Sequence, residues 1–409
     1  MGCQSRLRRA NRLVLAVAFA SAAVRLEAAP QNDGPATLPC FSDVDATTSA
    51  ADAIQACIDR APAGATVEIP SGKYILNHQI VISTPVTLRT ADGASAASCV
   101  TAPETCAELT AAPELAERWG MLVVQSTREV RLEHFIIDGN RSARTTSPAA
   151  QFCVDGDNAY GFNVSVLECE ECGVEDLISR NALCGTGMVW TGAGASIERS
   201  AFLSNGDAAT RSMWADGLTA LYAPRSIIRD NIFENNSDVA LIVGFGVDSR
   251  VERNAIVQRT QPSFAGLMLD NFNSNDRTAR GDFRGAVVAN NTIDCGPQLC
   301  TFGIQVGPRP WYPTNNIAGG EVHDNIVMGA KIGINVDGAG DRDAPTAIFS
   351  NTVDPPMPGS YFAECSHPIP AEWMNISPTS IIDRRNEDTR TGSHLSDSCQ
   401  LSSKLSTEP

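Results

Sequence analysis

A short phrase of the form apolar-x-x-Asn-x-apolar recurs between about residues 174 and 353, and it restricts the fold more than any other feature. Its copies read IIRDNIF, VERNAIV, VVANNTI, EVHDNIV and AIFSNTV, with asparagines at Asn231, Asn254, Asn291, Asn325 and Asn351. These asparagines are 23, 37, 34 and 26 residues apart. Self-similarity at such intervals is typical of solenoids and other repeat folds.

Each copy predicts a short β-strand, because apolar and polar residues alternate over four to six positions. A second strand phrase alternates with the first and reads GLTALY, GLMLDN, GIQVG and GINVDG. With no helical periodicity between the phrases, the sequence predicts an all-β solenoid in which each repeat is one coil. Stacked strands of neighbouring coils are about 4.8 Å apart, so the recurring asparagines are expected to form a structural amide ladder.

Residues 1–29 have the features of an export signal, and we predict a secreted or periplasmic protein. Four arginines precede an apolar stretch from Leu13 to Val24, and Leu26-Glu27-Ala28 is a candidate cleavage site. The apolar stretch is too short for a membrane anchor. Removal of the segment changes the net charge from −16 to about −20, because five Arg and one Glu are lost. A charge of this sign argues against nucleic acid or an anionic membrane as a partner.

Thirteen cysteines are present, and loss of Cys3 with the signal leaves an even number. An even count in an exported chain favours disulfides. We expect pairs between sequence neighbours: Cys99–Cys106, Cys169–Cys172, Cys295–Cys300 and Cys365–Cys399. Cys169-x-x-Cys172 has no second CxxC or His pair nearby in sequence, which favours a disulfide over a zinc or redox motif.

One amphipathic helix is predicted, over Thr47 to Ala61, with Thr47 or Thr48 as its N-cap. A helix before the first coil is suited to cover the open apolar end of a solenoid. Residues 91–120 are expected to be an Ala-rich insertion, and residues 141–160 a polar loop. We therefore predict one solenoid domain over residues 30–353 and an irregular tail over residues 354–409.

The helix followed by ATVEIPSGKYIL, then VTL, then coils of the GLTALY…IIRDNIF kind resembles the pectate-lyase-like right-handed parallel β-helix proteins. The resemblance covers about residues 45–353. It implies a single right-handed parallel β-helix, with loops on the scaffold as the usual place of function.

A narrower likeness is to the polygalacturonase-type glycoside hydrolases, which carry Asn-Thr-Asp-Gly, then Asp-Asp, then Gly-His-Gly. This chain has WADG at residues 214–217, SDVA at 237–240 and FAGL at 264–267. Asp216 and Asp238 match two of the family's acids. Ser237 stands in place of another acid, and Ala265 in place of the histidine.

Asp216 and Asp238 are 22 residues apart, which is close to one uninterrupted coil. Two carboxylates stacked on neighbouring coils repel each other, so one pKa rises and a proton donor persists near neutral pH. Asp270 follows the glycine of GLMLDN by four residues, and Asp337, two coils on, follows the glycine of GINVDG by the same number. Both are predicted to lie outside the core. The same flank supplies the predicted substrate-binding residues Trp214, Tyr222, Asn271, Gln305, Arg309 and Trp311, with Tyr312 close by.

Three functions remain open from the sequence: a polysaccharide hydrolase using Asp216 and Asp238, a uronan lyase or epimerase, and a non-catalytic glycan-binding surface β-helix. The second would need Arg211, Arg225, Arg250 or Arg309 to neutralise a substrate carboxylate, because the chain has only three lysines. We expect a monomer that acts on a polysaccharide or oligosaccharide and requires no cofactor. The alternative role of the Asp column is to bind Ca2+.

Overall fold

The computed structural model describes residues 36–41, 49–91, 97–153, 161–210, 213–271, 281–308, 317–336, 339 and 344–353. The predicted signal, the tail over residues 354–409 and the Cys365–Cys399 pair lie outside these ranges. No helix among the described residues is long and apolar enough to cross a membrane.

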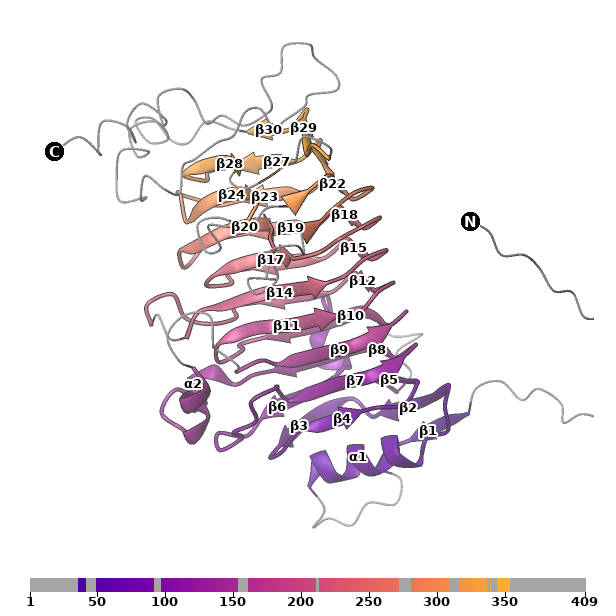
Figure 1. Cartoon of the computed structure of the whole chain (residues 1–409). Helices are drawn as coiled ribbons and strands as arrows, with labels where there is room; N and C mark the ends of the chain where they lie inside the picture. Colours follow the sequence, from indigo (N-terminus) through magenta and orange to yellow (C-terminus); the bar gives the residue numbers. More distant parts are fainter. Residues whose placement is uncertain are drawn as a thin grey trace, which may run out of the picture. The chain divides into compact units, whose positions relative to one another are not determined.

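The chain is a right-handed parallel β-helix, as predicted, and one strand of each coil belongs to a nine-stranded parallel sheet. Figure 1 shows these strands stacked in chain order. Nine strands correspond to nine coils. The strands are β4 (Ile80–Ile82), β7 (Leu122–Arg128), β9 (Val164–Glu170), β11 (Gly185–Thr191), β14 (Ala215–Tyr222), β17 (Val239–Val243), β20 (Ser263–Leu269), β24 (Cys300–Val306) and β28 (Ile332–Val336).

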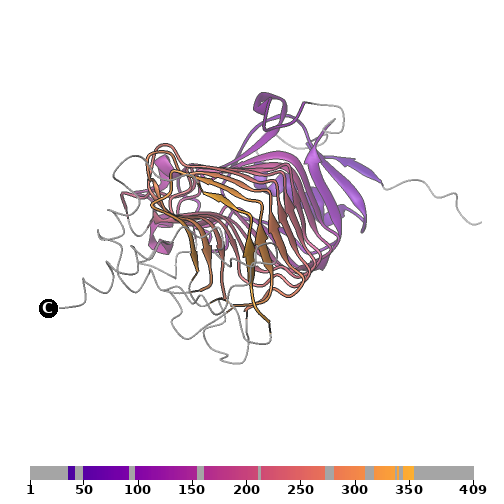
Figure 2. The ribbon, with the colours of Figure 1, turned by 90° about the horizontal axis from the view of Figure 1, so that it is seen from above.

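The other strands of the coils form a nineteen-stranded parallel sheet with two faces. Successive coils lie over one another in Figure 2. The early strands are β1 (Thr37–Pro39), β2 (Ala65–Ile69), β3 (Gly72–Leu76), β5 (Val86–Thr90), β6 (Ala107–Ala111), β8 (Arg131–Asp138) and β10 (Gly173–Arg180). The later strands come in pairs, one strand on each face: β12 (Ser196–Glu198) and β13 (Ala201–Leu203), β15 (Ile227–Arg229) and β16 (Ile232–Glu234), β18 (Arg250–Glu252) and β19 (Ala255–Val257), β22 (Val287–Ala289) and β23 (Thr292–Asp294), β26 (Glu321–His323) and β27 (Ile326–Met328), β29 (Ala347–Phe349) and β30 (Thr352–Val353).

A residue in the left-handed backbone region forms the corner between these two faces in coil after coil. The corner φ is 55° at His134, 51° at Asp176 and 57° at Asp230, and Arg253 and Asn290 repeat it. One left-handed residue turns the chain sharply, so each later corner lies between two short strands. Corner residues of neighbouring coils are therefore brought level with each other.

The repeated asparagines follow these corners and form the predicted ladder. Asn231 Nδ2 donates to Asn254 Oδ1 at 3.0 Å, and Asn254 Nδ2 donates to Asn291 Oδ1 at 2.9 Å. The same bond links Asn291 to Asn325 and Asn325 to Asn351. Each amide also serves backbone groups, so the ladder satisfies polar groups at a buried corner where water is excluded.

The helical cap is present and is shorter than predicted. Helix α1 spans Ala50–Arg60, and Ser49 caps it by accepting the backbone N–H of Asp52 at 3.1 Å. Thr47 and Thr48 lie outside the described residues. Gln55 exchanges two hydrogen bonds with the backbone of Val81 in β4, at 2.8 and 3.0 Å. The helix therefore supplies hydrogen bonds to the backbone of β4, the first strand of the nine-stranded sheet, while its apolar side covers the core.

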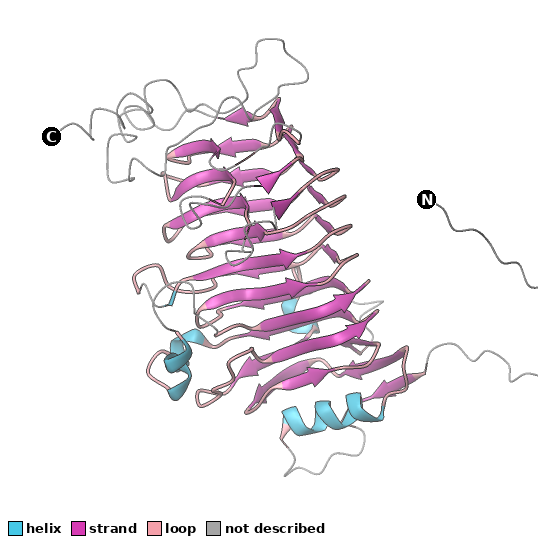
Figure 3. Cartoon of the chain, viewed as in Figure 1, coloured by secondary structure: helices cyan, strands magenta, loops and turns pink. Residues whose placement is uncertain are grey.

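Part of the segment expected to be an insertion is a strand of the scaffold. β6 pairs in register with β3 and β8, so the prediction for residues 91–120 was wrong over residues 107–111. Alanines hid this strand because their β-propensity is low. Figure 3 shows how little helix accompanies the strands. Among the described residues, the named helices besides α1 are α2 (Arg141–Arg144) and the 3₁₀ turns η1 (Pro103–Thr105) and η2 (Pro148–Phe152). A small third sheet pairs β21 (Gly281–Asp282) with β25 (Ile317–Ala318).

Five disulfides join the ten described cysteines. The predicted pairs Cys99–Cys106, Cys169–Cys172 and Cys295–Cys300 are confirmed. Two further pairs, Cys40–Cys57 and Cys153–Cys184, were not assigned from the sequence, because their members are 17 and 31 residues apart. The first of them ties the segment after β1 to helix α1.

Candidate functional site

Asp216 is the second residue of β14, and its carboxylate is held by two hydrogen bonds. Oδ2 accepts the hydroxyl of Thr219 at 2.6 Å, and Oδ1 accepts the backbone N–H of Val239 at 3.1 Å. Asp216 and Thr219 lie on one side although they are three residues apart. The intervening Gly217 and Leu218 both face inward, and a Cβ at Gly217 would lie 2.4 Å from the carbonyl oxygen of Ala240.

The pKa of Asp216 is raised well above its ordinary value. Burial is the largest cause, the charge of Asp238 comes next, and the charge of Asp270 adds to them. The bonds from Thr219 and Val239 act in the opposite direction, because they stabilise the charged form. Asp216 is thus a carboxyl group that can hold a proton where an ordinary aspartate is ionised.

Asp238 directly precedes β17 and lies one coil from Asp216. Leu218 is level with Leu241 and the N–H of Asp238 bonds to the carbonyl of Ala215, so Asp238 is one residue out of step with Asp216. The two acids were expected to stack on neighbouring coils, and the structure corrects that expectation by this offset of one residue. They remain close enough for the charge of Asp238 to act on Asp216.

The two departures from the polygalacturonase pattern have structural roles. Ser237 is buried, and its Oγ accepts the backbone N–H of Ala215 at 2.9 Å. Ala265 is buried in β20 between Val239 and Phe302. Neither position therefore supplies an ionisable side chain beside the acid pair.

Asp270 was predicted to share the column outside the core, and its position differs in two ways. It follows the end of β20, whereas Asp216 and Asp238 stand at the start of their strands. It is also only 2% exposed, and its Oδ1 accepts the N–H of Asn271 at 2.6 Å. Gly281 approaches from the third sheet, where a Cβ would lie 2.9 Å from the Cβ of Asn271. Asp270 and Asn271 are therefore covered, and Asp270 acts on Asp216 through its charge.

Gln305, predicted to contact substrate, is completely buried. Its Nε2 donates to the carbonyl of Gly307 at 3.0 Å, and its Oε1 accepts from Asn335 at 2.7 Å. Gln305 thus belongs to a second amide contact between coils and does not line an open groove. The predicted residues Arg309, Trp311, Tyr312 and Asp337 lie outside the described part of the chain.

Trp214 and Tyr222 stand at opposite ends of β14 and are both exposed. Trp214 is 40% exposed, and its ring nitrogen donates to the carbonyl of Ala208 at 3.3 Å. Tyr222 is 48% exposed and stacks on Phe245 with ring centroids 4.8 Å apart. Trp214 is two residues from Asp216, so only Trp214 is at the acid pair's end of the strand.

A cavity of about 500 Å³ lies next to the loop that carries Trp214. The segments that lead into β14 and β20 form it, together with the start of α2. Its lining consists of Arg141, Ser204, Asp207, Ala208, Ala209, Thr260, Gln261 and Pro262. None of the three candidate acids lines this cavity.

The cavity lining carries one cationic side chain, Arg141, and one acidic side chain, Asp207. Arg141 bonds to the carbonyl of Ser204. Burial lowers the pKa of Arg141, while the charges of Asp207 and Asp138 act in the opposite direction. Gln261 bridges the loops by accepting the N–H of Ala208 at 3.1 Å. The cavity is therefore lined mainly by amide, hydroxyl and peptide groups, and it has no surplus of positive charge.

Sequence reasoning missed Thr219, Arg141, Asp207 and Gln261. Thr219 follows Asp216 by three positions, which regular alternation places on the opposite face. The three others come from segments 54 to 120 residues apart in sequence, so no local motif unites them. In the described part of the chain, Asp216, Asp238 and Asp270 do not form a set of three ligand atoms close enough for one metal ion.

The sequence matches no known protein family and no curated protein. Solved structures with a similar fold include a hyperthermoactive exopolygalacturonase from Thermotoga maritima, with 13% identity, a TM-score of 0.46 and coverage of 73% of this chain and 74% of that one. The Dettilon tailspike protein has 10% identity, a TM-score of 0.47 and coverage of 78% and 68%. An alginate lyase from a Paenibacillus species has 14% identity, a TM-score of 0.43 and coverage of 78% and 96%. These likenesses are of fold.

Proposed function

We propose that this parallel β-helix protein is an exported glycan hydrolase in which Asp216 donates a proton to the leaving oxygen and Asp238 is the partner carboxylate. The observation that carries the proposal is the position of Asp216, whose carboxylate is bonded to Thr219 and to the N–H of Val239, the residue after Asp238. The raised pKa of Asp216, caused by burial and by the charge of Asp238, supports it. Hydrolysis of a glycosidic bond uses one protonated and one ionised carboxyl group, on either side of the bond. Environments that separate the pKa values of two neighbouring acids supply this combination.

Each group has a defined part in the proposed reaction. Asp216 holds its proton until the glycosidic oxygen accepts it, and the Thr219 hydroxyl and Val239 N–H then bind the carboxylate that results. Asp238 stabilises positive charge at the sugar carbon, directly or through an activated water molecule. Asp270 acts at a distance by raising the pKa of Asp216.

A neutral glycan is the substrate class that the charges favour. The whole chain carries a net charge of −16, and Arg141 at the cavity already faces Asp138 and Asp207. Trp214 offers an exposed ring two residues before Asp216, and aromatic faces with a polar edge suit sugar rings. The cavity beside Trp214 provides hydroxyl and amide groups from Ser204, Thr260 and Gln261.

A uronan lyase remains the alternative, and the described residues support it less. Elimination next to a uronic acid needs a cation to neutralise the substrate carboxylate. Arg250 is engaged with Glu252 at 2.9 Å, and no arginine contributes to the pKa shift of Asp216. Arg211 and Arg309 lie outside the described residues.

The proposal is tested by incubating the purified protein with matched panels of neutral and uronic polysaccharides. New reducing ends and the ultraviolet absorbance of unsaturated products are measured in the same samples. We expect reducing ends from a neutral glycan without unsaturated products. Unsaturated products from a uronan would establish the lyase instead. Binding without cleavage across both panels would support the non-catalytic surface protein.

A further inference from the structure

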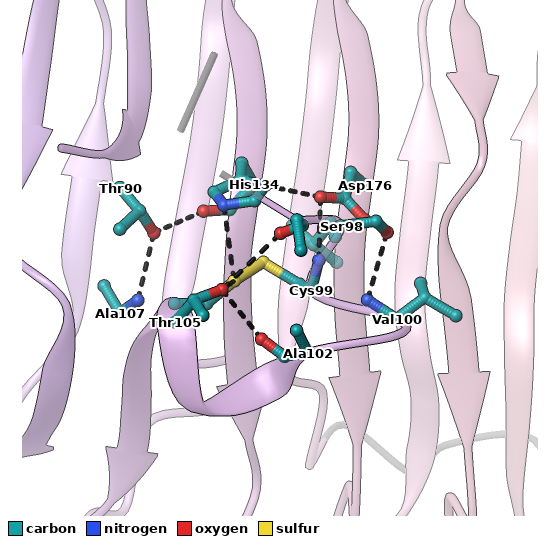
Figure 4. Close-up of a disulfide and its surroundings, with 12 residues drawn as sticks. Thr90, Ser98, Cys99, Val100, Ala102, Thr105, Ala107, His134 and Asp176 are labelled. Atoms are coloured by element: carbon teal, nitrogen blue, oxygen red, sulfur yellow. Dashed lines mark hydrogen bonds and ion pairs between the residues drawn. A yellow bond between two sulfur atoms is a disulfide. The ribbon is translucent and has the colours of Figure 1, made fainter. Parts of the chain in front are cut away.

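The strongest unassigned cluster outside the acid pair surrounds the Cys99–Cys106 disulfide. Figure 4 shows His134 beside the two sulfur atoms, with Asp176 behind the imidazole. Cys99 is fully buried, Cys106 is 3% exposed and His134 is 6% exposed. In the described part of the chain, only Cys99, Cys106 and His134 form a group of three possible metal ligands, with the ligand atoms all within 4.8 Å of one another.

The fold itself creates the contact between His134 and Asp176. Both are left-handed corner residues, and the register of β8 and β10 places Glu133 opposite Glu175 and Phe135 opposite Leu177. The corners of neighbouring coils are therefore level, and the side chains meet through His134 Nδ1 and Asp176 Oδ2.

Asp176 also determines which imidazole nitrogen is free to bind a metal. Its carboxylate accepts the Cys99 N–H at 3.0 Å and the Ser98 hydroxyl, so it acts as an acceptor toward every neighbour. The Nδ1 atom of His134 therefore carries the proton. The other ring nitrogen, Nε2, lies 3.5 Å from Cys106 Sγ, on the side of the two sulfurs. A carboxylate behind a histidine is the arrangement that orients metal-binding imidazoles in proteins.

We propose that Cys99, Cys106 and His134 form a Zn2+ site when the disulfide is reduced, with Asp176 as the positioning residue for His134. Zinc binds thiolate sulfur at about 2.3 Å and imidazole nitrogen at about 2.0–2.1 Å in tetrahedral geometry, which implies a sulfur–nitrogen separation of about 3.6 Å. The observed 3.5 Å between Cys106 Sγ and His134 Nε2 agrees with this value. Two sulfurs and one nitrogen leave a fourth position for water.

The change between the two states balances as follows. A trialkylphosphine breaks the S–S bond, takes the oxygen of a water molecule to become the phosphine oxide, and leaves the two hydrogens of that water on the sulfurs. Zn2+ then replaces the two thiol protons, which pass to solvent, and accepts the Nε2 lone pair without a further proton change. Either the covalent bond or the metal thus holds the loop of residues 97–106 against the coils.

The test is to reduce the full chain with phosphine, remove metals with a chelator and titrate it with Co2+ as a spectroscopic probe, then compete with Zn2+. We expect one Co2+ per chain with a thiolate charge-transfer band and tetrahedral d–d bands. The band should disappear when Cys99→Ser and Cys106→Ser are combined. His134→Gln should weaken Zn2+ binding at least about tenfold.

The matched control combines Cys295→Ser with Cys300→Ser, which removes another buried disulfide with a short loop and no histidine ligand among the described residues. This variant should bind Co2+ like the parent. A folded, reduced parent that binds no Co2+, or binding that persists without Cys99 and Cys106, would overturn the proposal.

A second measurement decides the matter if full reduction unfolds the chain. The single variant Cys99→Ser leaves the other disulfides intact and gives Cys106 a free thiol beside His134. We expect Zn2+ to slow alkylation of Cys106 at least about tenfold, and this protection to be lost when His134→Gln is added. Alkylation that proceeds at the same rate with and without Zn2+ contradicts the proposed site.

Discussion

The backbone N–H of Val239 donates a hydrogen bond to Asp216 Oδ1 at 3.1 Å, across the boundary between two coils. Val239 follows Asp238, so the bond holds the carboxylate of one acid next to the chain segment that carries the other. Stacking of β14 on β17 therefore brings together two acids that are 22 residues apart in sequence. The proposed chemistry depends on this inter-coil contact.

Replacement of either acid should abolish most of the activity. Asp216→Asn and Asp238→Asn retain the shape of the side chain and remove the titrating group. General acid–base catalysis contributes about a hundredfold or more, so kcat on a cleaved substrate should fall at least about a hundredfold in each variant. Asp59→Asn, at an exposed position in helix α1, is the matched control and should leave kcat unchanged. Near-parental activity in both site variants would refute the paired-acid mechanism.

The stability of the fold should depend on pH through Asp216. Its pKa is higher in the folded chain than in the unfolded chain. In an unfolded chain an aspartate has a pKa of about 3.9. The folded state therefore binds more protons, and its stability falls as pH rises from about 4 through the raised pKa. Asp216→Asn removes this loss. The melting temperature of the variant relative to the parent should rise between pH 4 and pH 7, and a constant difference would contradict the shifted pKa.

Substitution of an asparagine in the middle of the amide ladder should destabilise the fold more than substitution at its end. Asn254→Ala removes an acceptor for two N–H groups of Asn231 and a donor to Ile228 and Asn291. An unsatisfied buried polar group costs about 1–3 kcal/mol, so we expect a loss of at least about 3 kcal/mol in the free energy of unfolding. Asn351→Ala, at the partly buried end of the ladder, should cost less. Denaturant titration of both variants measures the difference, and equal losses would count against the ladder as the cause.

The disulfides should contribute according to the length of the loop that each closes. Cys153–Cys184 spans 31 residues and Cys295–Cys300 spans 5. The chain-entropy relation predicts stabilisation of roughly 3.5 kcal/mol for the longer loop and about 2 kcal/mol for the shorter one. Paired Ser substitutions and denaturant unfolding test this order. Mass spectrometry of peptides from the unreduced protein should show all five pairs, and free thiols at these positions would contradict them.

Trp214 should contribute to substrate binding more than to the chemical step. Its exposed ring stands beside the cavity and two residues from Asp216. Trp214→Ala should raise KM about tenfold, as expected for the loss of roughly 1.4 kcal/mol of ring–sugar contact, with a smaller change in kcat. Trp119→Ala is the control, because Trp119 is equally exposed and belongs to an earlier part of the chain. A similar rise in KM for both variants would assign the effect to general destabilisation.

Local pattern alone determined the coil architecture of this protein. The recurring asparagines and the strand phrases repeat because these coils have the same buried corner between two short strands, where the asparagine amide hydrogen-bonds the backbone. The same reasoning located the three short-range disulfides, and it located the cap helix to within a few residues. It placed Asp216 and Asp238 on neighbouring coils, where the structure offsets them by one residue. It misjudged residues 107–111, where alanine gives a weak strand signal and pairing with β3 and β8 decides the structure.

The tertiary structure alone decided which side chains meet between coils and which are covered. Regular alternation predicted that Asp270 and Gln305 face outward, but Gly281 packs over one and Asn335 bonds to the other. Gly217 and Leu218 both face inward, so the Thr219 hydroxyl reaches the carboxylate of Asp216. Stacked corners place His134 against Asp176, 42 residues later. A period-2 pattern specifies the face of a residue within its own strand. The length of each intervening loop sets the register between coils, and that register determines which chemical groups become neighbours.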